Sequence, residues 1–328
     1  MKKIQFNEIA GFQTGQFTDE KGGTGVTVIL SPEGATAGVD VRGGGPATRE
    51  TDLLHPKNMV QKINAVVLSG GSAFGLEAGS GVMEYCKEHG YGFDMKDIVV
   101  PIVCQASLFD LSCGDVNAAP DKAMGYAAAK ASEENRLQSG NYGAGTGASV
   151  GKALGTDKAM KSGLGSCAYE IGPLQVGAVV AVNACGDVFY PDSTERLAGI
   201  YDRTSHQEIN TEEAVLALAA NLMDNINRNT TIGCIITNAD FTQAEMTKLA
   251  GMTQNALART IRPVHTPSDG DTIFAMTTNQ VEADLTLVSI MAVKAMEKAI
   301  VDALESAQAA YGLESWASLQ EIKKNHTA

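Results

Sequence analysis

With 328 residues, the chain is long enough to bury a substantial core as one large domain or two smaller ones. Its hydrophobic fraction of 44% and charged fraction of 19% are ordinary for a soluble globular protein. The formal net charge of -13 argues against a nucleic-acid partner and disfavours an anionic membrane surface, because either would require a concentrated basic surface.

The first half of the chain alternates predicted strands and helices. Two short strands, at 26–30 and 37–41, are joined by the turn signal Ser-Pro-Glu-Gly at 31–34. A compact apolar strand at 65–68 leads through a Gly-Gly-Ser turn into a helix. The helices predicted in this half cover residues 73–88 and 122–134.

The second half continues the alternation. Thr242 and Glu245 form a T-x-x-E capping box, which predicts that a helix begins there. With no repeats and no low-complexity linker, the pattern predicts a mixed α/β class with helices outside the sheets. The strands predicted here cover 176–183, 232–237 and 272–277, and the other helices cover 213–226 and 282–309.

Neither a metal site nor a membrane segment is predicted. The six cysteines include no C-x-x-C pair, so they are expected to be reduced core residues. The histidines show no ligand spacing, and Asp269-Gly270-Asp271 lacks a third carboxylate in calcium-loop spacing. No apolar run follows Lys2 and Lys3, so a secretory signal is not expected there. No apolar stretch approaches about 20 residues, so a membrane-spanning helix is not expected. A reducing cytoplasm is the expected location.

Two glycine-rich patterns fail as nucleotide sites. Residues 145–152 resemble a P-loop, but that motif requires glycine where Thr146 stands and serine or threonine where Ala153 stands. Residues 143–148 match the loose form G-x-G-x-x-A, yet a polar stretch precedes them rather than a strand. We therefore expect these glycines to allow close backbone packing or positive φ angles.

Ser72 offers one hypothesis for a nucleophile. A strand, a sharp Gly-Gly-Ser turn and a helix resemble the nucleophile elbow of α/β hydrolases, and His265 could serve as the base. The elbow requires G-x-S-x-G, however, and Phe74 occupies the position of the final glycine. A serine that caps a helix is the simpler interpretation.

Thr230 is a second candidate, because it follows Asn229 and lies just ahead of a predicted strand. Cleavage of the Asn229–Thr230 bond would leave an α-amine and a hydroxyl on one residue at the mouth of that strand. Such a residue holds a base beside its nucleophile, which is one way to activate a weak hydroxyl. Thr231 is the nearest competing nucleophile.

The residues around this bond resemble the L-aminopeptidase/D-esterase family, which includes β-aminopeptidases and nylon-oligomer endoamidases. The segment 229–240 begins Asn-Thr-Thr-Ile-Gly, a version most similar to the nylon-oligomer branch. The segment 257–272, which includes Pro-Val-His-Thr-Pro-Ser-Asp-Gly-Asp-Thr, is equally similar. Further segments with this likeness follow the family's order over nearly the whole chain: 34–44, 48–53, 68–75 and 179–183.

The resemblance implies a four-layer α-β-β-α sandwich, like that of N-terminal-nucleophile hydrolases but with different connectivity. It implies one catalytic domain over 1–328 that cleaves itself into 1–229 and 230–328. Members are typically homo-oligomers, often tetramers, and need no cofactor. The implied substrate is a small peptide, an amino-acid amide or ester, or an ω-amino-acid oligomer.

The resemblance also assigns roles to individual residues. Thr230 matches the nucleophile, and Asn183 matches an asparagine that binds the oxyanion or orients the substrate. Asp269 and Asp271 match an acidic pair of the nylon-oligomer branch that could hold the Thr230 ammonium. Lys152 matches a lysine of the same branch that could polarise an oxygen or lower the pKa of the hydroxyl.

One departure and two alternatives accompany this assignment. Phe109 stands where some members carry a tyrosine, so an oxyanion contact from that phenol is missing and classical aminopeptidase specificity is in doubt. Acyl transfer to an amine, as in the similarly folded ornithine acetyltransferases, is an alternative reaction. An uncleaved homologue that acts as a binding or assembly protein is an alternative of another class.

Overall fold

The computed structural model describes residues 1–219 and 229–327. Within these residues the main sheet has ten strands, and the longest, β3 (Thr24–Val41), pairs on both sides. In one direction the sheet continues through β19 (Thr272–Val281), β17 (Thr230–Ala239), β12 (Leu174–Asn183), β11 (Leu164–Ile171) and β1 (Lys2–Ile4). In the other direction lie β5 (Lys62–Ser69), β8 (Val103–Ser107) and β4 (Thr48–Arg49), and β2 (Gln13–Asp19) also pairs with β3.

The two halves of this sheet pack face to face. Ile232 of β17 and Phe274 of β19 share one buried cluster with Leu68 of β5. The alternate residues Ile235 and Ile273 belong to a different cluster. Because successive side chains of a strand point to opposite faces, both faces of these strands are buried. This is why their sequences are nearly continuous apolar runs.

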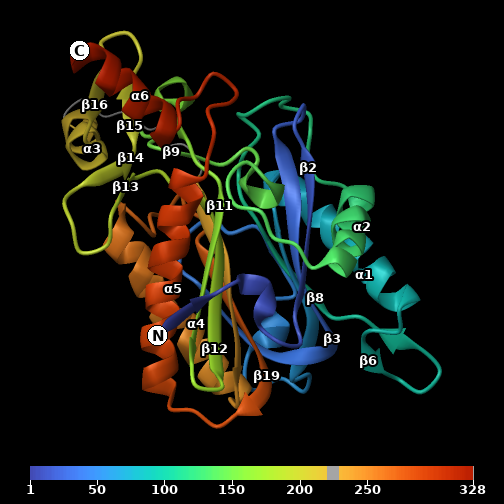
Figure 1. Ribbon diagram of the computed structural model, residues 1–328. Helices are drawn as coiled ribbons and strands as arrows, with labels where there is room; N and C mark the ends of the chain where they lie inside the picture. The colour runs from blue at the N-terminus through green and yellow to red at the C-terminus, as the bar shows by residue number, and fades with distance from the viewer. Residues whose placement is uncertain (220–228, 328) are drawn as a thin grey trace.

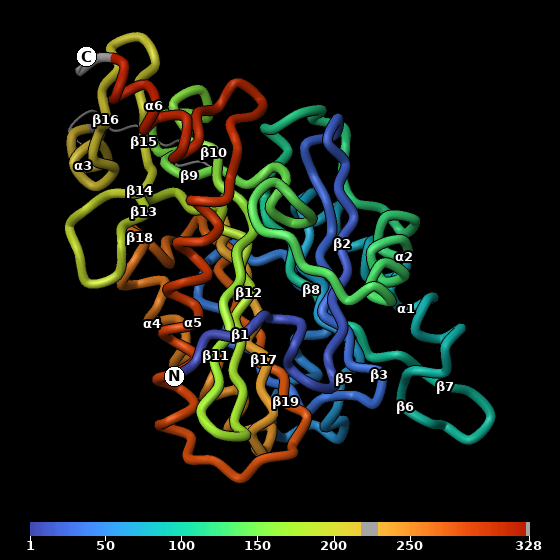
Figure 2. The backbone as a smooth tube through the Cα atoms, viewed as in Figure 1, coloured from blue at the N-terminus to red at the C-terminus, as the bar shows by residue number. Residues whose placement is uncertain are grey.

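Helices cover the outer face of each half, as Figures 1 and 2 show. Helices α4 (Gln243–Thr260) and α5 (Leu285–Glu305) lie over the half that contains β17. Helices α1 (Ala78–Glu88) and α2 (Lys122–Ala131) lie over the half that contains β5. The layers therefore follow the order α-β-β-α, and the expected four-layer sandwich is confirmed.

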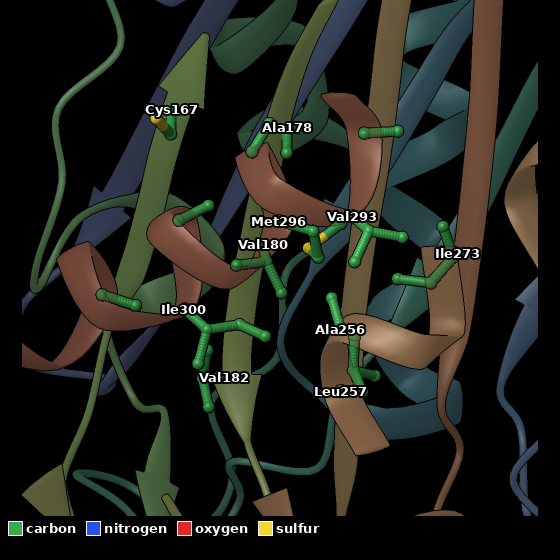
Figure 3. Close-up of a cluster of buried hydrophobic side chains, with 14 of the residues drawn as sticks. Cys167, Ala178, Val180, Val182, Ala256, Leu257, Ile273, Val293, Met296 and Ile300 are labelled. Carbon is green, nitrogen blue, oxygen red and sulfur yellow. The ribbon is translucent and has the colours of Figure 1, made fainter. Parts of the chain in front are cut away.

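Figure 3 shows the packing of α5 on the sheet. Met296 and Ile300 of α5 contact the cluster that contains Val180 and Val182 of β12. The buried residues of α5 extend from Val288 to Leu304. Leu287, in the first turn, is 40% exposed.

The prediction of two short strands at 26–30 and 37–41 is wrong, because β3 runs through both. Strand β5 pairs with β3 on both sides of residues 31–34, Leu30 standing opposite Ala65 and Ala35 opposite Ile63. The residues between them form an irregularity within one ladder rather than a turn between two strands. Gly34 adopts a φ of +74° there, which glycine tolerates without a side-chain clash.

The ends of several helices also differ from prediction. The helix predicted over 73–88 begins as a 3-10 helix, η3 (Ser72–Glu77), and becomes α-helical at Ala78. The capping box of Thr242 and Glu245 is confirmed at the start of α4. Helix α3 (Thr211–Ala219) accounts for the first part of the helix predicted over 213–226, and 220–226 lie outside the described residues.

All six cysteines are buried, and none forms a disulfide, in agreement with the prediction of reduced core residues. Burial raises the pKa of Cys86 to about 12 and that of Cys185 to about 11. These thiols therefore stay protonated at neutral pH. Within the described ranges, no helix combines the length and the apolar character needed to cross a bilayer.

Phe274→Ala should lower the free energy of unfolding by about 3–5 kcal/mol, because it removes a buried ring from between the two half-sheets. Phe93→Ala is the matched control: that ring is 40% exposed, and its loss should change the free energy by no more than about 0.5 kcal/mol. Urea denaturation followed by circular dichroism measures both. Equal losses would contradict the assignment of the inter-sheet layer as a core.

Candidate active site

Thr230, the first residue of β17, lies opposite Asn183, the last residue of β12. Thr230 is 5% exposed and Asn183 is fully buried. By strand alternation, Thr230 shares its face with Ile232, and Asn183 shares its face with Ala181, both in the inter-sheet layer. The two side chains therefore point toward the second half-sheet, whereas Thr231 points to the opposite face.

The hydroxyl of Thr230 lies against the carbonyl group of the residue before it. Its Oγ1 donates a hydrogen bond to the Asn229 carbonyl oxygen at 2.5 Å. The backbone N–H of Gly270 donates to the same oxygen at 2.9 Å. A Cβ at position 270 would lie 2.8 Å from Thr230 Oγ1, so glycine permits this approach. Two donors thus converge on the Asn229 carbonyl.

Asn183 also holds a buried lysine. Lys152 Nζ donates to Asn183 Oδ1 at 2.7 Å and to the Asn183 carbonyl oxygen at 2.9 Å. The backbone N–H of Ser149 donates to Oδ1 at 3.1 Å. Burial lowers the pKa of Lys152 to about 8, although nearby thiols and carboxyl groups, including that of Asp269, oppose this shift. The two donors on Oδ1 fix the orientation of the Asn183 amide.

The nitrogen of that amide reaches the other half-sheet. Asn183 Nδ2 donates to the backbone carbonyl of Phe109 at 2.9 Å, in the loop that follows β8. Its second N–H has no acceptor within residues 1–219 and 229–327. Phe109 thus contributes its backbone to the site, and one amide N–H of Asn183 is available to another acceptor.

Asp269 and Asp271 lie beside the start of β17. Asp271 Oδ1 accepts the Thr231 N–H at 2.7 Å, and its Oδ2 contacts the backbone N and Nδ1 of His265 at 3.1 and 2.9 Å. Asp269 Oδ2 accepts the Thr266 N–H at 2.6 Å, whereas Oδ1 is buried with no partner among the described residues. Burial, reinforced by the neighbouring Asp271 charge, raises the pKa of Asp269 to about 6. Its Oδ1 can accept from a cationic donor.

The loop after β3 packs tightly on this acidic segment. The backbone N–H of Arg42 donates to the Asp271 carbonyl at 2.9 Å, and that of Gly45 donates to the Asp269 carbonyl at 2.8 Å. A Cβ at Gly43 would lie only 2.1 Å from the Asp269 carbonyl oxygen. The glycines after β3 therefore allow backbone to meet backbone where a larger residue would force the acidic pair away.

The predicted catalytic residues come together in one place. Thr230 and Asn183 are register partners, and Lys152 binds Asn183 directly. Asp269 and Asp271 flank the glycine that touches the Thr230 hydroxyl and the Asn229 carbonyl. Residues that are far apart in the sequence thus form a single buried site at the ends of β12, β17 and β19.

The geometry does not support the alternative nucleophile Ser72. His265 pairs with Asp271, and its Nε2 has no hydrogen-bond partner in the described part of the chain. Ser72 therefore does not complete a serine–histidine pair. Its interpretation as a helix N-cap is also wrong, because Gly71 is the N-cap of η3 and Ser72 is the first residue, with a φ of +54°.

Sequence reasoning missed Asp110, which is 2% exposed. Its carboxylate accepts the Gly71 N–H at 2.7 Å and the Thr24 hydroxyl at 2.8 Å. Burial raises the pKa of Asp110 to about 6. Asp110 thus anchors the loop that carries the Phe109 carbonyl, and an isolated aspartate in a loop gives no sequence signal for that role. The pairing of His265 with Asp271 was also missed, although both lie in one short segment.

The fold resembles that of solved hydrolases. An L-aminopeptidase D-Ala-esterase/amidase from Ochrobactrum anthropi, described as a new variant among the Ntn hydrolase fold, superimposes with a TM-score of 0.69. The two are 17% identical, and the superposition covers 98% of this chain and 93% of that one. The likeness establishes the N-terminal-nucleophile-hydrolase type of fold that the sequence predicted.

Fold and relatives together define an enzyme, a hydrolase of the peptidase and amidase type. The model of Peptidase family S58 matches residues 5–316, and the chain belongs to that family. An uncharacterised aminopeptidase of Mycobacterium leprae is 41% identical over 298 residues, which are 85% of this chain and 80% of that protein. A 6-aminohexanoate-oligomer endohydrolase of Paenarthrobacter ureafaciens is 32% identical over 287 residues, 85% of this chain and 76% of that protein.

The raised pKa of Asp269 predicts a pH-dependent effect of Asp269→Asn. Between pH about 4 and about 6 the folded chain binds this proton more tightly than the unfolded chain, so stability falls as pH rises. The Asp269→Asn variant has no carboxyl group to titrate and so avoids this loss of stability. Between pH about 4 and about 6, the free energy of unfolding of the variant should therefore rise relative to that of the parent, by at most about 1.4 kcal/mol per pH unit.

Urea denaturation at several pH values measures this difference, with Thr230→Ala in both chains so that their covalent state is the same. Asp94→Asn, at an exposed position, is the control. Parallel pH dependence of the parent and the Asp269→Asn variant would contradict the raised pKa.

Proposed function

We propose that the chain is a self-processing amide hydrolase in which Thr230, freed as a new N-terminus, is the nucleophile. The observation that carries the proposal is the convergence on the Asn229 carbonyl of the Thr230 hydroxyl and the Gly270 N–H. The hydroxyl belongs to the residue that would attack, and the N–H would stabilise negative charge on the attacked oxygen. Membership of Peptidase family S58 supports the same reaction class.

Maturation would proceed through an ester. Thr230 Oγ1 attacks the Asn229 carbonyl carbon, the C–N bond breaks, and the departing nitrogen takes up a proton to become the α-amine. Water then hydrolyses the ester, which leaves a carboxylate on Asn229 and a free hydroxyl and amine on Thr230. The products are chains 1–229 and 230–328, held together by the sheet that both contribute to.

Turnover would use the same oxygen. The α-amine of Thr230 accepts the hydroxyl proton as Oγ1 attacks the substrate carbonyl, and later donates it to the leaving amine. The unused N–H of Asn183 stabilises the oxyanion, and the Lys152 ammonium holds that amide in place. The unpartnered Oδ1 of Asp269, with Asp271 nearby, balances the charge of the α-ammonium. Water hydrolyses the acyl-enzyme.

The proposed substrates are small peptides, amino-acid amides or esters, and ω-amino-acid oligomers. The names of the relatives, an aminopeptidase and a 6-aminohexanoate-oligomer endohydrolase, support this range. We also propose that the enzyme acts without a cofactor, as a homotetramer in the cytoplasm. Phe109 leaves the site without a phenol at the position that some members occupy with tyrosine, so Asn183 and backbone N–H groups would stabilise the oxyanion.

Thr230→Ala should abolish both cleavage and turnover, because it removes the attacking oxygen of both reactions. Thr231→Ala is the matched control, since that side chain lies on the opposite face of β17 and its hydroxyl has no partner in the described residues. Intact mass and hydrolysis of an amino-acid amide are measured on both. The assignment of Thr230 as the nucleophile would be contradicted if Thr230→Ala turned over the amide. It would also be contradicted if only Thr231→Ala lost turnover.

Asn183→Ala should lower kcat by about 10²–10³-fold, the usual effect of losing one oxyanion donor. The comparison uses only fully cleaved protein, separated from any uncut precursor, so that slow maturation is not mistaken for slow turnover. Steady-state kinetics on the same amide gives kcat and KM. A kcat equal to that of the wild type would remove Asn183 from the mechanism.

A further inference from the structure

A second lysine, Lys161, lies fully buried close to the site, and none of the steps proposed above uses it. It belongs to β10 (Met160–Lys161), which pairs with β9 (Ser149–Val150), near the top of the view in Figure 2. In the register of this pair Lys161 stands opposite Ser149, the residue whose N–H binds Asn183. Lys161 is therefore next to the segment that orients the Asn183 amide.

The ammonium group of Lys161 is enclosed by backbone carbonyl oxygens. Its Nζ donates to Gly145 at 3.1 Å, to Ala148 at 3.0 Å, and to Ser162. An ammonium has three N–H donors and no acceptor, so three carbonyls match it fully. Burial lowers the pKa of Lys161 to about 7, and the nearby Cys113 and Asp110 oppose that shift.

The glycine-rich segment 143–152, which resembles a P-loop but cannot serve as one, supplies two of these carbonyls and packs closely on neighbouring backbone. A Cβ at Gly145 would lie 2.1 Å from the Leu164 nitrogen, and one at Gly147 would lie 2.0 Å from the Gly23 carbonyl oxygen. Gly143 and Gly151 adopt φ angles of +52° and +73°, as expected of glycines that shape a tight backbone path. The segment wraps around a cation of the protein itself.

The wrapped segment leads directly into the site. Ser149 follows Ala148 and donates its N–H to Asn183 Oδ1, and Lys152 follows Gly151 and donates to the same oxygen. Any displacement of the segment would move both donors together. Both contacts on Asn183 Oδ1 therefore depend on the path that Lys161 holds.

We propose that Lys161 is a positioning residue, whose ammonium fixes residues 145–149 so that Ser149 and Lys152 orient the Asn183 amide toward the substrate oxyanion. The inference rests on the proposed role of Asn183. A neutral side chain of similar size would remove the ammonium donor from three buried carbonyls. Those of Gly145 and Ala148 would each keep a backbone N–H, that of Ser162 would lose its donor, and the segment would shift to compensate. Lys161 acts on catalysis only through Asn183 and Lys152.

Lys161→Met should lower kcat by about 10²-fold with little change in KM, because small misplacements of catalytic groups have effects of that size. Lys158→Met is the matched control: it lies three residues away, is partly exposed, and pairs with Asp202 at 3.0 Å. Its kcat should equal that of the wild type. A wild-type kcat in folded Lys161→Met would overturn the proposal.

Chemical rescue with small molecules distinguishes the contribution of the Lys161 charge from that of its packing. In Lys161→Ala, n-propylammonium restores the missing atoms and the charge, whereas n-propanol restores similar bulk without charge. We expect the amine, but not the alcohol, to raise the kcat of Lys161→Ala. The wild type is measured with the same additives, and this comparison corrects for any rate increase that arises because the amine accepts the acyl group. Equal rescue by both, or none by the amine, would overturn the proposal. If Lys161→Met does not fold, Lys161→Gln replaces it in the kinetic comparison.

These measurements remain distinct from the test of the nucleophile. If Thr230→Ala retained turnover, the proposed function would fail whatever the Lys161 variants did. If Thr230→Ala were inactive and Lys161→Met fully active, the proposed function would stand and only the role of Lys161 would fail.

Discussion

Asn183 stands opposite Thr230 in the register between β12 and β17, and its buried amide joins parts of the chain that are far apart in sequence. Its Oδ1 binds Lys152 and the Ser149 N–H, while its Nδ2 binds the Phe109 carbonyl across the inter-sheet layer. A slip of one residue between the strands would turn the Thr230 hydroxyl to the opposite face. The close packing on both faces of β12 and β17 prevents that slip, so the core and the site are specified together.

Burial of charge is the second constraint on this site. Lys152 and Lys161 are almost completely excluded from water, and so are Asp110, Asp269 and Asp271. Each of these groups is bound by backbone N–H or carbonyl groups or by a buried amide, which reduces the cost of removing it from water. The exception is Oδ1 of Asp269, which is buried without a partner among the described residues. A site that lacks one cationic donor in the intact chain is suited to the α-ammonium that cleavage would create.

Much of the fold could be predicted from the sequence, because apolar runs and the capping box of Thr242 and Glu245 depend on local physics. The four-layer order required the family resemblance, since periodicity does not say which faces meet. The resemblance also directed attention to Thr230, Asn183, Lys152, Asp269 and Asp271, and the structure brings them together. The Phe109 carbonyl and the Gly270 and Ser149 N–H groups could not be predicted, because backbone groups are common to nearly all residue types. Strand β3 was divided wrongly because Ser-Pro-Glu-Gly is also a common turn.

The most direct test of Thr230 as a nucleophile is the intact mass of freshly purified protein under denaturing conditions, combined with N-terminal sequencing. Self-cleavage before Thr230 would give two fragments of about 24 and 10 kDa from the chain of 34.3 kDa, the smaller beginning at Thr230. A chain that keeps its full mass for days while it hydrolyses an amide would contradict the Thr230 mechanism, because its Thr230 would have no α-amine to act as the base.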